Sequence, residues 1–300
     1  MFQLISDGGC DFTLQEIANH SIDIVPFYVS FDQQNYLKEG VDITREDFFH
    51  RLISDKSLFP KTAQPNPQDY MDVAIPYLDQ GQDVIFVTIS SKVSGSYNSA
   101  MLASNLLKES HPARSIYVID SLNGSIGQGL ILKELLAMKA VGIDTAQAVK
   151  IAQKIVPTVK TYFSVDSLEY LRRGGRIGPT TAFVGSLLGL RPILQLEDGA
   201  ISQLDNVRGK KKARAMIEEA VVEVLREEAA HINVAIAHIL SPEDAAEFKG
   251  NIETAIGASI LNPIAEVCPA IGAHVGPGAL VLSYCQKYTS FGGAFLNAIG

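Results

Sequence analysis

Apolar runs of strand length alternate with helix-like stretches through the first half of the chain. The strand-like runs are residues 2–5, 22–29, 84–90 and 115–120. The helix-like stretches are residues 12–20, a segment that begins at Thr44, and residues 66–80, 95–109 and 124–141. Pro26 lies inside the second run and predicts an edge or a bend, because proline cannot donate to a strand ladder. Strands that alternate with helices predict a parallel α/β sheet with helices on both faces.

The pattern changes after about residue 156. Residues 158–165 and 192–197 are predicted strands, and the turn signal Asp198-Gly199 predicts a hairpin with residues 200–207. A helix over residues 209–228 has one apolar stripe, formed by Ala213, Met216, Ile217, Ala220, Val221 and Val224. A strand, a helix and a last strand follow at residues 232–238, 242–256 and 278–284. We therefore expect two domains, an α/β domain over residues 1–156 and an α+β domain with a mixed sheet over residues 157–300.

Composition and charge exclude several classes of protein. The chain has 300 residues and a net charge of −8, from 33 acidic and 25 basic residues, which argues against nucleic-acid binding. Cys10, Cys268 and Cys285 are scattered, so neither a disulfide framework nor a cysteine metal site is expected. The first residues lack the pattern of a signal peptide, and no apolar run approaches the roughly 20 residues of a membrane helix. These features predict a cytoplasmic protein.

Polar loops follow the predicted parallel strands. They are residues 7–11, 88–96 and 120–124. Because the carboxyl ends of parallel strands meet at one edge of a sheet, these loops are expected to converge on one crevice. The helix that follows Ser94 and Gly95 would direct its N-terminal N–H groups there, which favours an anion, and Gly95 would let the backbone approach it closely.

Two short segments are rich in hydroxyl groups and are expected in loops. They are Lys61-Thr62-Ala63-Gln64-Pro65 and Ser90-Ser91-Lys92-Val93-Ser94-Gly95-Ser96-Tyr97. Neither supplies a strong base or a set of metal ligands, so both suit an anionic head group better than bond cleavage. A third segment, residues 272–278, would add the imidazole of His274.

Each of these residues also has a purely structural interpretation. Thr62 is a turn residue on its local pattern, and Ser94 equally suits a helix cap. Asp7 and Asp11 form either a carboxylate pair or, for Asp11, a cap for the next helix. The basic segments 172–176, expected after a short helix, and 208–214 are either solvated faces or a docking patch for an acidic partner.

Six segments together resemble the signature motifs of the DegV family, bacterial proteins that bind a single fatty acid. In chain order they are residues 61–65, 90–97, 165–177, 189–193, 207–213 and 272–278. The resemblance implies that Thr62 and Ser94, with Gly95, hold the carboxylate and that His274 lies beside it. It also implies that Arg172 or Arg173 presents the head group to a partner.

The same resemblance implies a carrier that is not itself an enzyme. It has no cofactor, metal or catalytic residue of its own, and its lipid site lies between the two domains. The expected partners are a separate ATP-dependent kinase subunit and a membrane acyltransferase. Arg176, Lys61 and Ser96 are further candidates for contact with the head group or the partner. The first loop, residues 6–11, departs from the family pattern, as do Ala63 and Ser96.

Two other functions remain open at this stage. Ser94 and His274 would form an acyl-transfer pair, although the chain has no Gly-x-Ser-x-Gly elbow. A binder of a small phosphate or sugar would use the same loops without an apolar tunnel. The candidate tunnel residues suit an ordinary core equally well, and they are Phe27, Val29, Ile126, Leu130, Phe163, Leu187, Leu188 and Ile193.

Overall fold

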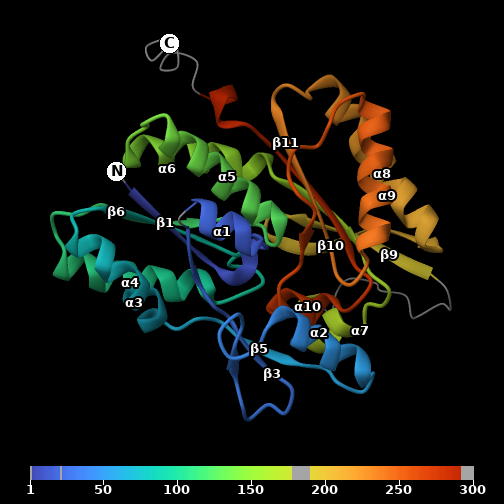
Figure 1. Cartoon of the computed structure of the whole chain (residues 1–300), viewed down its shortest axis with the longest axis horizontal. Coiled ribbons are helices and arrows are strands. Elements are labelled where there is room, and N and C mark those ends of the chain that lie inside the picture. Colours follow the sequence, from blue (N-terminus) through green and yellow to red (C-terminus); the bar gives the residue numbers. More distant parts are fainter. Residues whose placement is uncertain (1, 21, 178–189, 292–300) are drawn as a thin grey trace.

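The computed structural model describes residues 2–20, 22–177 and 190–291, and it confirms the predicted α/β class (Figure 1). Four parallel strands in the order β2-β1-β6-β7 form the first sheet. Their bounds are Phe2–Asp7 (β1), Asp23–Val25 (β2), Asp83–Thr88 (β6) and Ile116–Asp120 (β7). All four come from the first half of the chain, where the sequence predicts a parallel sheet.

Helices cover both faces of this sheet, two on each (Figure 1). The bounds are Pro67–Asp79 (α3) and Ser96–Ser110 (α4) on one face, and Ile126–Ala140 (α5) and Thr145–Ile155 (α6) on the other. Asn66 and Asp69 form a capping box that starts α3. Helix α6 is absent from the predicted elements, although its cap at Asp144 and its apolar face are ordinary helix signals.

The second sheet has six strands in the order β10-β9-β8-β13-β11-β12. Their bounds are Lys160–Ser164 (β8), Leu190–Glu197 (β9), Ala200–Arg208 (β10), Ile232–His238 (β11), Ala265–Glu266 (β12) and Leu280–Gln286 (β13). Strands β9 and β10 form the predicted hairpin, and Asp198 and Gly199 at its tip have φ angles of 48° and 83°. Positive φ at both central residues is typical of the tightest hairpin turns.

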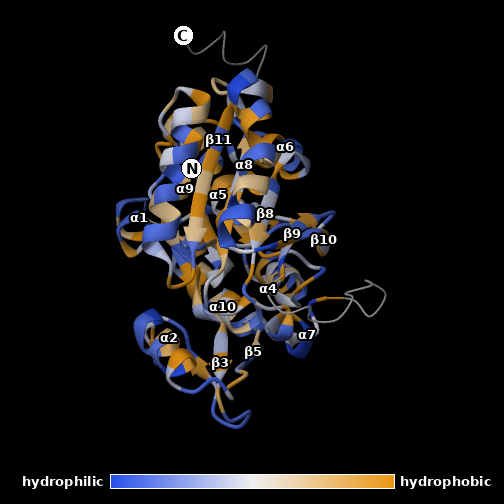
Figure 2. Cartoon of the chain, turned by 90° about the vertical axis from the view of Figure 1, so that its right-hand side faces the viewer, coloured by the Kyte–Doolittle hydropathy of each residue, from blue (hydrophilic) through white to orange (hydrophobic). Residues whose placement is uncertain are grey.

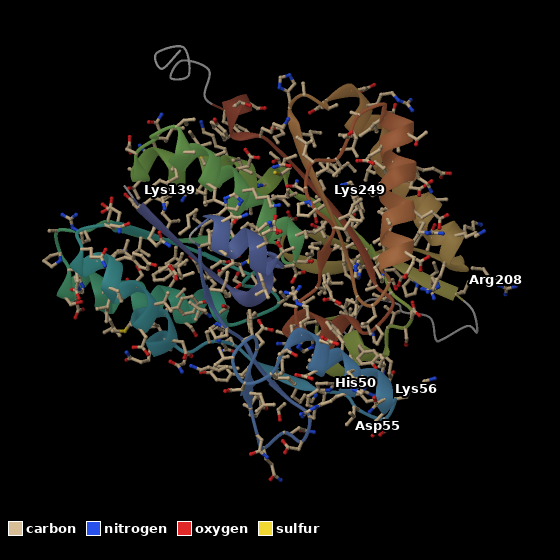
Figure 3. All side chains as sticks on the ribbon, in the orientation of Figure 1. His50, Asp55, Lys56, Lys139, Arg208 and Lys249 are labelled. Carbon is tan, nitrogen blue, oxygen red and sulfur yellow. The ribbon has the colours of Figure 1, made fainter. Side chains whose placement is uncertain are left out.

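Helix α8 (Lys210–Glu227) and helix α9 (Pro242–Ile256) lie together on the outer side of this sheet (Figure 1). Ala213, Ile217 and Val221 of the predicted α8 stripe are buried, whereas Ala220 is exposed. Arg208, at the end of β10, points away from the body of the protein (Figure 3).

A third, small sheet has the order β4-β3-β5, and it corrects two predictions. Its strands are Tyr28–Ser30 (β3), Leu37–Lys38 (β4) and Lys61–Ala63 (β5). The single strand predicted over residues 22–29 is instead broken at Pro26 into β2 and β3, which lie in different sheets. Residues 61–63 are a strand and not a loop, because they pair with β3.

Four short elements lie near the ends of the two larger sheets. They are Leu14–His20 (α1), Arg45–Ser54 (α2), Glu169–Gly174 (α7) and Pro269–Val275 (α10). Thr44 caps α2 as predicted, and α2 alternates hydrophilic and hydrophobic stretches (Figure 2). The segment expected as a loop around His274 is largely helix α10. Of the arginines expected after a short helix, Arg172 and Arg173 lie inside α7, whereas Arg176 follows it.

Helix α5 packs against both larger sheets, and the largest buried cluster includes residues from both halves of the chain. The halves therefore share a core at the place where the two sheets approach each other. Within the described ranges, no helix is both long and apolar enough to cross a membrane.

Candidate functional site

A cavity lies between the two larger sheets and the small one. It holds about 830 Å³ of space free of atoms, including the solvent at its mouth. Its lining is mostly apolar and consists of Phe27, Thr62, Ile89, Val93, Ser94, Gly124, Ser125, Thr161, Phe163, Leu171, Arg176, Leu196, Ile201, Val267, Ala270, Ile271, His274, Val275 and Val281. Both halves of the chain contribute to this lining, and its apolar walls with a few polar groups are typical of small-molecule sites.

Four polar side chains in the lining belong to the segments singled out from the sequence: Thr62, Ser94, Arg176 and His274. Thr62 Oγ1 lies 2.7 Å from His274 Nε2, although the two residues are 212 positions apart in the sequence. Strand β5 supplies the threonine and the last turn of α10 supplies the histidine. The fold thus brings the first and last of the candidate segments into direct contact.

His274 is electrically neutral in this site. Burial, together with the nearby positive charges of Arg176 and Lys61, lowers its pKa to about 3. Its Nδ1 is buried and has no hydrogen-bond partner among the described residues. A side chain at Gly174 would overlap this nitrogen, so glycine is required there. An acyl-transfer pair needs a hydrogen bond between the serine and the histidine. In the described part of the chain, no hydrogen bond joins Ser94 and His274.

Arg176 is a cationic residue among the described residues that line the cavity. It donates from Nε to the Val93 carbonyl over 3.1 Å and from Nη1 to the Gly174 carbonyl over 2.7 Å. Burial lowers its pKa. No carboxylate among the described residues forms an ion pair with it. An unpaired, half-buried guanidinium favours an anionic ligand.

Ser94 lies just before helix α4. Its Oγ accepts from Ser96 N over 3.2 Å, and this contact leaves the hydroxyl proton free to donate. Gly95 follows, and a Cβ there would lie 2.8 Å from Gln64 Nε2. The two hydroxyl-rich segments therefore pack directly against each other at the cavity.

Other predicted contact residues lie outside the cavity. Ser96 is fully buried, donates to Asp7 Oδ2 over 2.5 Å and contacts Tyr70 OH, so its selection as a head-group or partner contact is wrong. Arg172 and Arg173 are exposed on α7, where both pair with Glu169. Lys61 Nζ donates to the Arg173 carbonyl over 3.1 Å, which connects this exposed basic group to the polar end of the cavity.

The first loop forms a short 3-10 turn, Gly8–Cys10, that lies beside the cavity but does not line it. A side chain at Gly8 would overlap Glu39 Oε1, and Glu39 Oε2 accepts from Ala270 N over 3.0 Å. Burial raises the pKa of Glu39 to about 7. Glu39 is not among the predicted site residues, because nothing in its local pattern distinguishes it from a surface residue.

Asp7 and Asp11 serve structure rather than a catalytic pair. Asp7 is buried and accepts from Ile89 N and Gln128 Nε2, among others. Asp11 does not cap the next helix as suggested, because it accepts from Cys268 N over 2.8 Å. Within residues 2–20, 22–177 and 190–291, no group of His, Cys, Asp and Glu side chains is placed to hold a metal ion.

The predicted tunnel walls divide into three groups. Phe27 and Phe163 line the cavity. Val29, Ile126, Leu130 and Ile193 are ordinary core residues. Leu187 and Leu188 lie outside the described residues, as does Gly189 of the fourth motif.

Comparison with protein families settles the family. A family model described as "Uncharacterised protein, DegV family" matches residues 1–287. The chain belongs to the DegV family. A DegV domain-containing protein of Caldanaerobacter subterraneus is 31% identical over 290 residues, which cover 95% of this chain and 98% of that protein.

Solved structures of DegV proteins share the fold. A protein of Eubacterium ventriosum, described as binding stearic acid, superposes with a TM-score of 0.91 at 31% identity, covering 97% of this chain and 100% of the other. A fatty-acid-binding DegV protein of Thermus thermophilus gives a TM-score of 0.85 at 27% identity, with 95% and 99% covered. DegV of Bacillus subtilis, described as a fatty-acid-binding protein, gives 0.83 at 25% identity, with the same coverage.

Proposed function

We propose that this protein binds one long-chain fatty acid in the cavity, with its carboxylate beside Thr62, Ser94, Arg176 and His274. One observation carries the proposal: a mostly apolar cavity is lined by a guanidinium that has no carboxylate partner among the described residues. Each buried methylene of an acyl chain contributes about 0.8 kcal/mol to the binding free energy, so the acyl chain supplies most of the affinity. The fatty-acid-binding relatives support the same ligand class.

The site favours retention over chemistry. A histidine with a pKa of about 3 is a poor general base near neutral pH, and its Nε2 is already engaged by Thr62. In the tautomer with a proton on Nε2, neutral His274 donates to Thr62 Oγ1, which leaves the Thr62 hydroxyl proton free to donate to a carboxylate. These features support a carrier and weigh against the alternative acyl-transfer enzyme.

We propose further that a separate ATP-dependent kinase subunit phosphorylates the bound carboxylate. The exposed arginines of α7 support this step. The side chains of Arg172 and Arg173 are 66% and 50% exposed, and Lys61 connects them to the cavity through the Arg173 carbonyl. The same proposal has three further parts. The two domains divide at residue 156, the protein is located in the cytoplasm, and an acyltransferase at the membrane acts downstream.

Titration of delipidated protein with stearic acid tests the binding. A saturable response with one acid per chain is expected. Octanoic acid should bind far more weakly, because it buries fewer methylene groups. Equal affinity for the two acids, or tight binding of inorganic phosphate instead, would support the small-anion alternative.

Removing one hydroxyl at the polar end should weaken binding moderately. Thr62→Ala and Ser94→Ala should each cost roughly 1.5–3 kcal/mol of binding free energy, the range for a hydrogen bond to a charged group. Calorimetric titration with stearic acid measures the loss, and Thr13→Ala, a threonine that caps α1 away from the cavity, serves as the matched control. Wild-type affinity in both variants would remove these hydroxyls from the site.

Reversing the exposed arginines should affect the partner and not the ligand. The double variant Arg172→Glu and Arg173→Glu should keep its fatty acid but slow acyl phosphate formation by the kinase, most clearly at low salt. Lys150→Glu and Lys154→Glu on α6, where both residues are exposed, provide a control of equal charge change. Equal rates of acyl phosphate formation in both double variants would show that the α7 arginines are ordinary solvated residues with no docking role.

A further inference from the structure

The β9–β10 hairpin forms one wall of the cavity. Leu196 and Ile201 are direct cross-strand partners near the hairpin tip, and both line the cavity. Ile89, Val93 and Ser94, which follow β6, line it from the first half of the chain. The hairpin therefore contributes to the cavity from the second half of the chain and meets the first half at its tip.

One hydrogen bond joins the hairpin to the first half of the chain. Ser90 Oγ donates to the Gly199 carbonyl over 2.7 Å. Among the described residues, no other hydrogen bond or ion pair connects residues 190–208 with residues 2–156. Strand β10 is also the edge of its sheet, so its outer side has no partner strand among the described residues.

The tip of the hairpin fits closely against its neighbours. A Cβ at Gly199 would lie 2.6 Å from Ser90 Oγ and 3.1 Å from both Leu122 Cδ2 and Lys92 Cγ. Gly199 also has a φ of 83°, which glycine adopts freely. The surface formed by Ser90, Lys92 and Leu122 thus fits the turn at Gly199 closely, although a single hydrogen bond joins the two.

Ser90 is also the anchor of the loop that carries Ser94. It is fully buried, and its carbonyl accepts from Val93 N and Ser94 N, each over 3.1 Å. Its own N–H donates to the Asn123 carbonyl over 2.7 Å, and its Oγ accepts from Lys92 N over 3.1 Å. The three backbone bonds remain when the side chain of Ser90 is removed, and only the bond from Lys92 N is lost from the loop together with the hairpin contact.

We propose that Ser90 controls the exchange of the bound acid. When the bond from Ser90 Oγ to Gly199 breaks, the hairpin tip separates from the Ser90–Ser94 loop, and the acyl chain enters or leaves between Leu196, Ile201 and Val93. Among the described residues, two other walls are held more firmly, since β8 and β13 pair along their length and α10 is bonded at both ends to other elements. This inference rests on the proposed binding of a fatty acid.

Ser90→Ala tests the inference through rates. The association and dissociation rates of stearic acid should both rise roughly two- to tenfold, the factor expected for losing the one neutral hydrogen bond to the hairpin. The variant also loses the bond from Lys92 N, which lies within the loop and does not join it to the hairpin. The dissociation constant should stay within about twofold, because the contact closes the empty and the loaded protein alike. Ser91→Ala is the matched control, because its side chain is exposed and its hydroxyl makes no hydrogen bond to a described residue.

A reversible cross-link provides the opposite change. In a Lys92→Cys and Gly199→Cys double variant, the sulfur introduced at position 92 takes the place of Lys92 Cγ, 3.1 Å from the new Cβ at position 199. Oxidation should slow release of the acid at least tenfold, and a reductant should restore the rate. The reduced form of the double variant carries the same backbone strain and is therefore the proper reference. The three natural cysteines are all buried, so they should not compete for the cross-link.

Stopped-flow transfer of a fluorescent fatty acid from the protein to lipid vesicles measures release, and stopped-flow mixing of the same acid with delipidated protein measures association. Exchange in Ser90→Ala equal to that in Ser91→Ala would overturn the inference. So would equal rates in the oxidised and reduced pair, or a faster release matched by an equal loss of affinity, which indicates damage to the carboxylate site. If the wild-type protein binds no fatty acid, the proposed function fails and this inference fails with it. Normal binding with unchanged exchange refutes the inference alone.

Discussion

Arg176→Glu should weaken fatty acid binding on the order of a hundredfold. The wild-type guanidinium lines the cavity and has no carboxylate partner among the described residues, so a bound carboxylate is its natural counter-charge. A hydrogen bond to a charged group contributes about 1.5–3 kcal/mol, and a glutamate placed there adds repulsion between like charges. Titration of the delipidated variant with stearic acid measures the effect.

Arg173→Glu is the matched control for this change. Arg173 lies three residues earlier, is exposed and already pairs with Glu169, so its reversal should leave binding unchanged. Thermal unfolding of both variants separates a loss of binding from a loss of folding, because Arg176 also bonds the Val93 and Gly174 carbonyls. Wild-type affinity in a folded Arg176→Glu variant would remove Arg176 from the head-group site.

Glu39→Gln should stabilise the protein at alkaline pH. Burial raises the pKa of Glu39 from 4.5 to about 7, against the opposing effects of Arg45 and the Ala270 N–H. The folded state therefore holds this proton more tightly than the unfolded state does. Its contribution to stability is fully present below about pH 4.5 and is lost as the pH rises through 7. Each pKa unit corresponds to about 1.36 kcal/mol, so the loss amounts to roughly 3 kcal/mol at high pH.

The glutamine variant separates charge from shape. A glutamine at position 39 cannot ionise, but its carbonyl oxygen can still accept from Ala270 N, the bond that Glu39 Oε2 makes. Denaturant unfolding from about pH 5 to about pH 9 should show the variant gaining on the wild type as the pH rises. Glu46→Gln, an exposed change on α2, should run parallel to the wild type. If Glu39→Gln also runs parallel, Glu39 is not the group that loses its proton near neutral pH.

Local sequence pattern predicts most of the regular elements. The alternation of apolar runs and helical stretches gives the parallel sheet and its covering helices, and Asp198-Gly199 gives the hairpin. The error at Pro26 has a simple cause: the proline signals a bend, but pattern alone cannot show that the next strand joins another sheet. Strand β5 and helix α10 are too short for a clear period, and tertiary partners stabilise them.

The site also contains residues that local motifs predict and residues that they do not. The motifs mark Thr62, Ser94 and His274, and the fold places all three in the cavity lining. Ser96, two residues from Ser94, points to Asp7 instead, because α4 begins there and turns the side chain inward. No motif marks Glu39, since its carboxylate is buried in the place that a side chain at position 8 would fill, and Gly8 lies 31 positions away in the sequence. Contacts between distant segments are not encoded in any local window.

Native mass spectrometry of the purified protein tests the central claim most directly. The account predicts one long-chain fatty acid per chain, held without a covalent bond and lost when the protein is denatured. Purification from cells grown with a labelled fatty acid should transfer the label to this bound acid. A protein that carries no lipid and takes none up after delipidation, or one whose added mass survives denaturation as an ester on Ser94, would contradict the account.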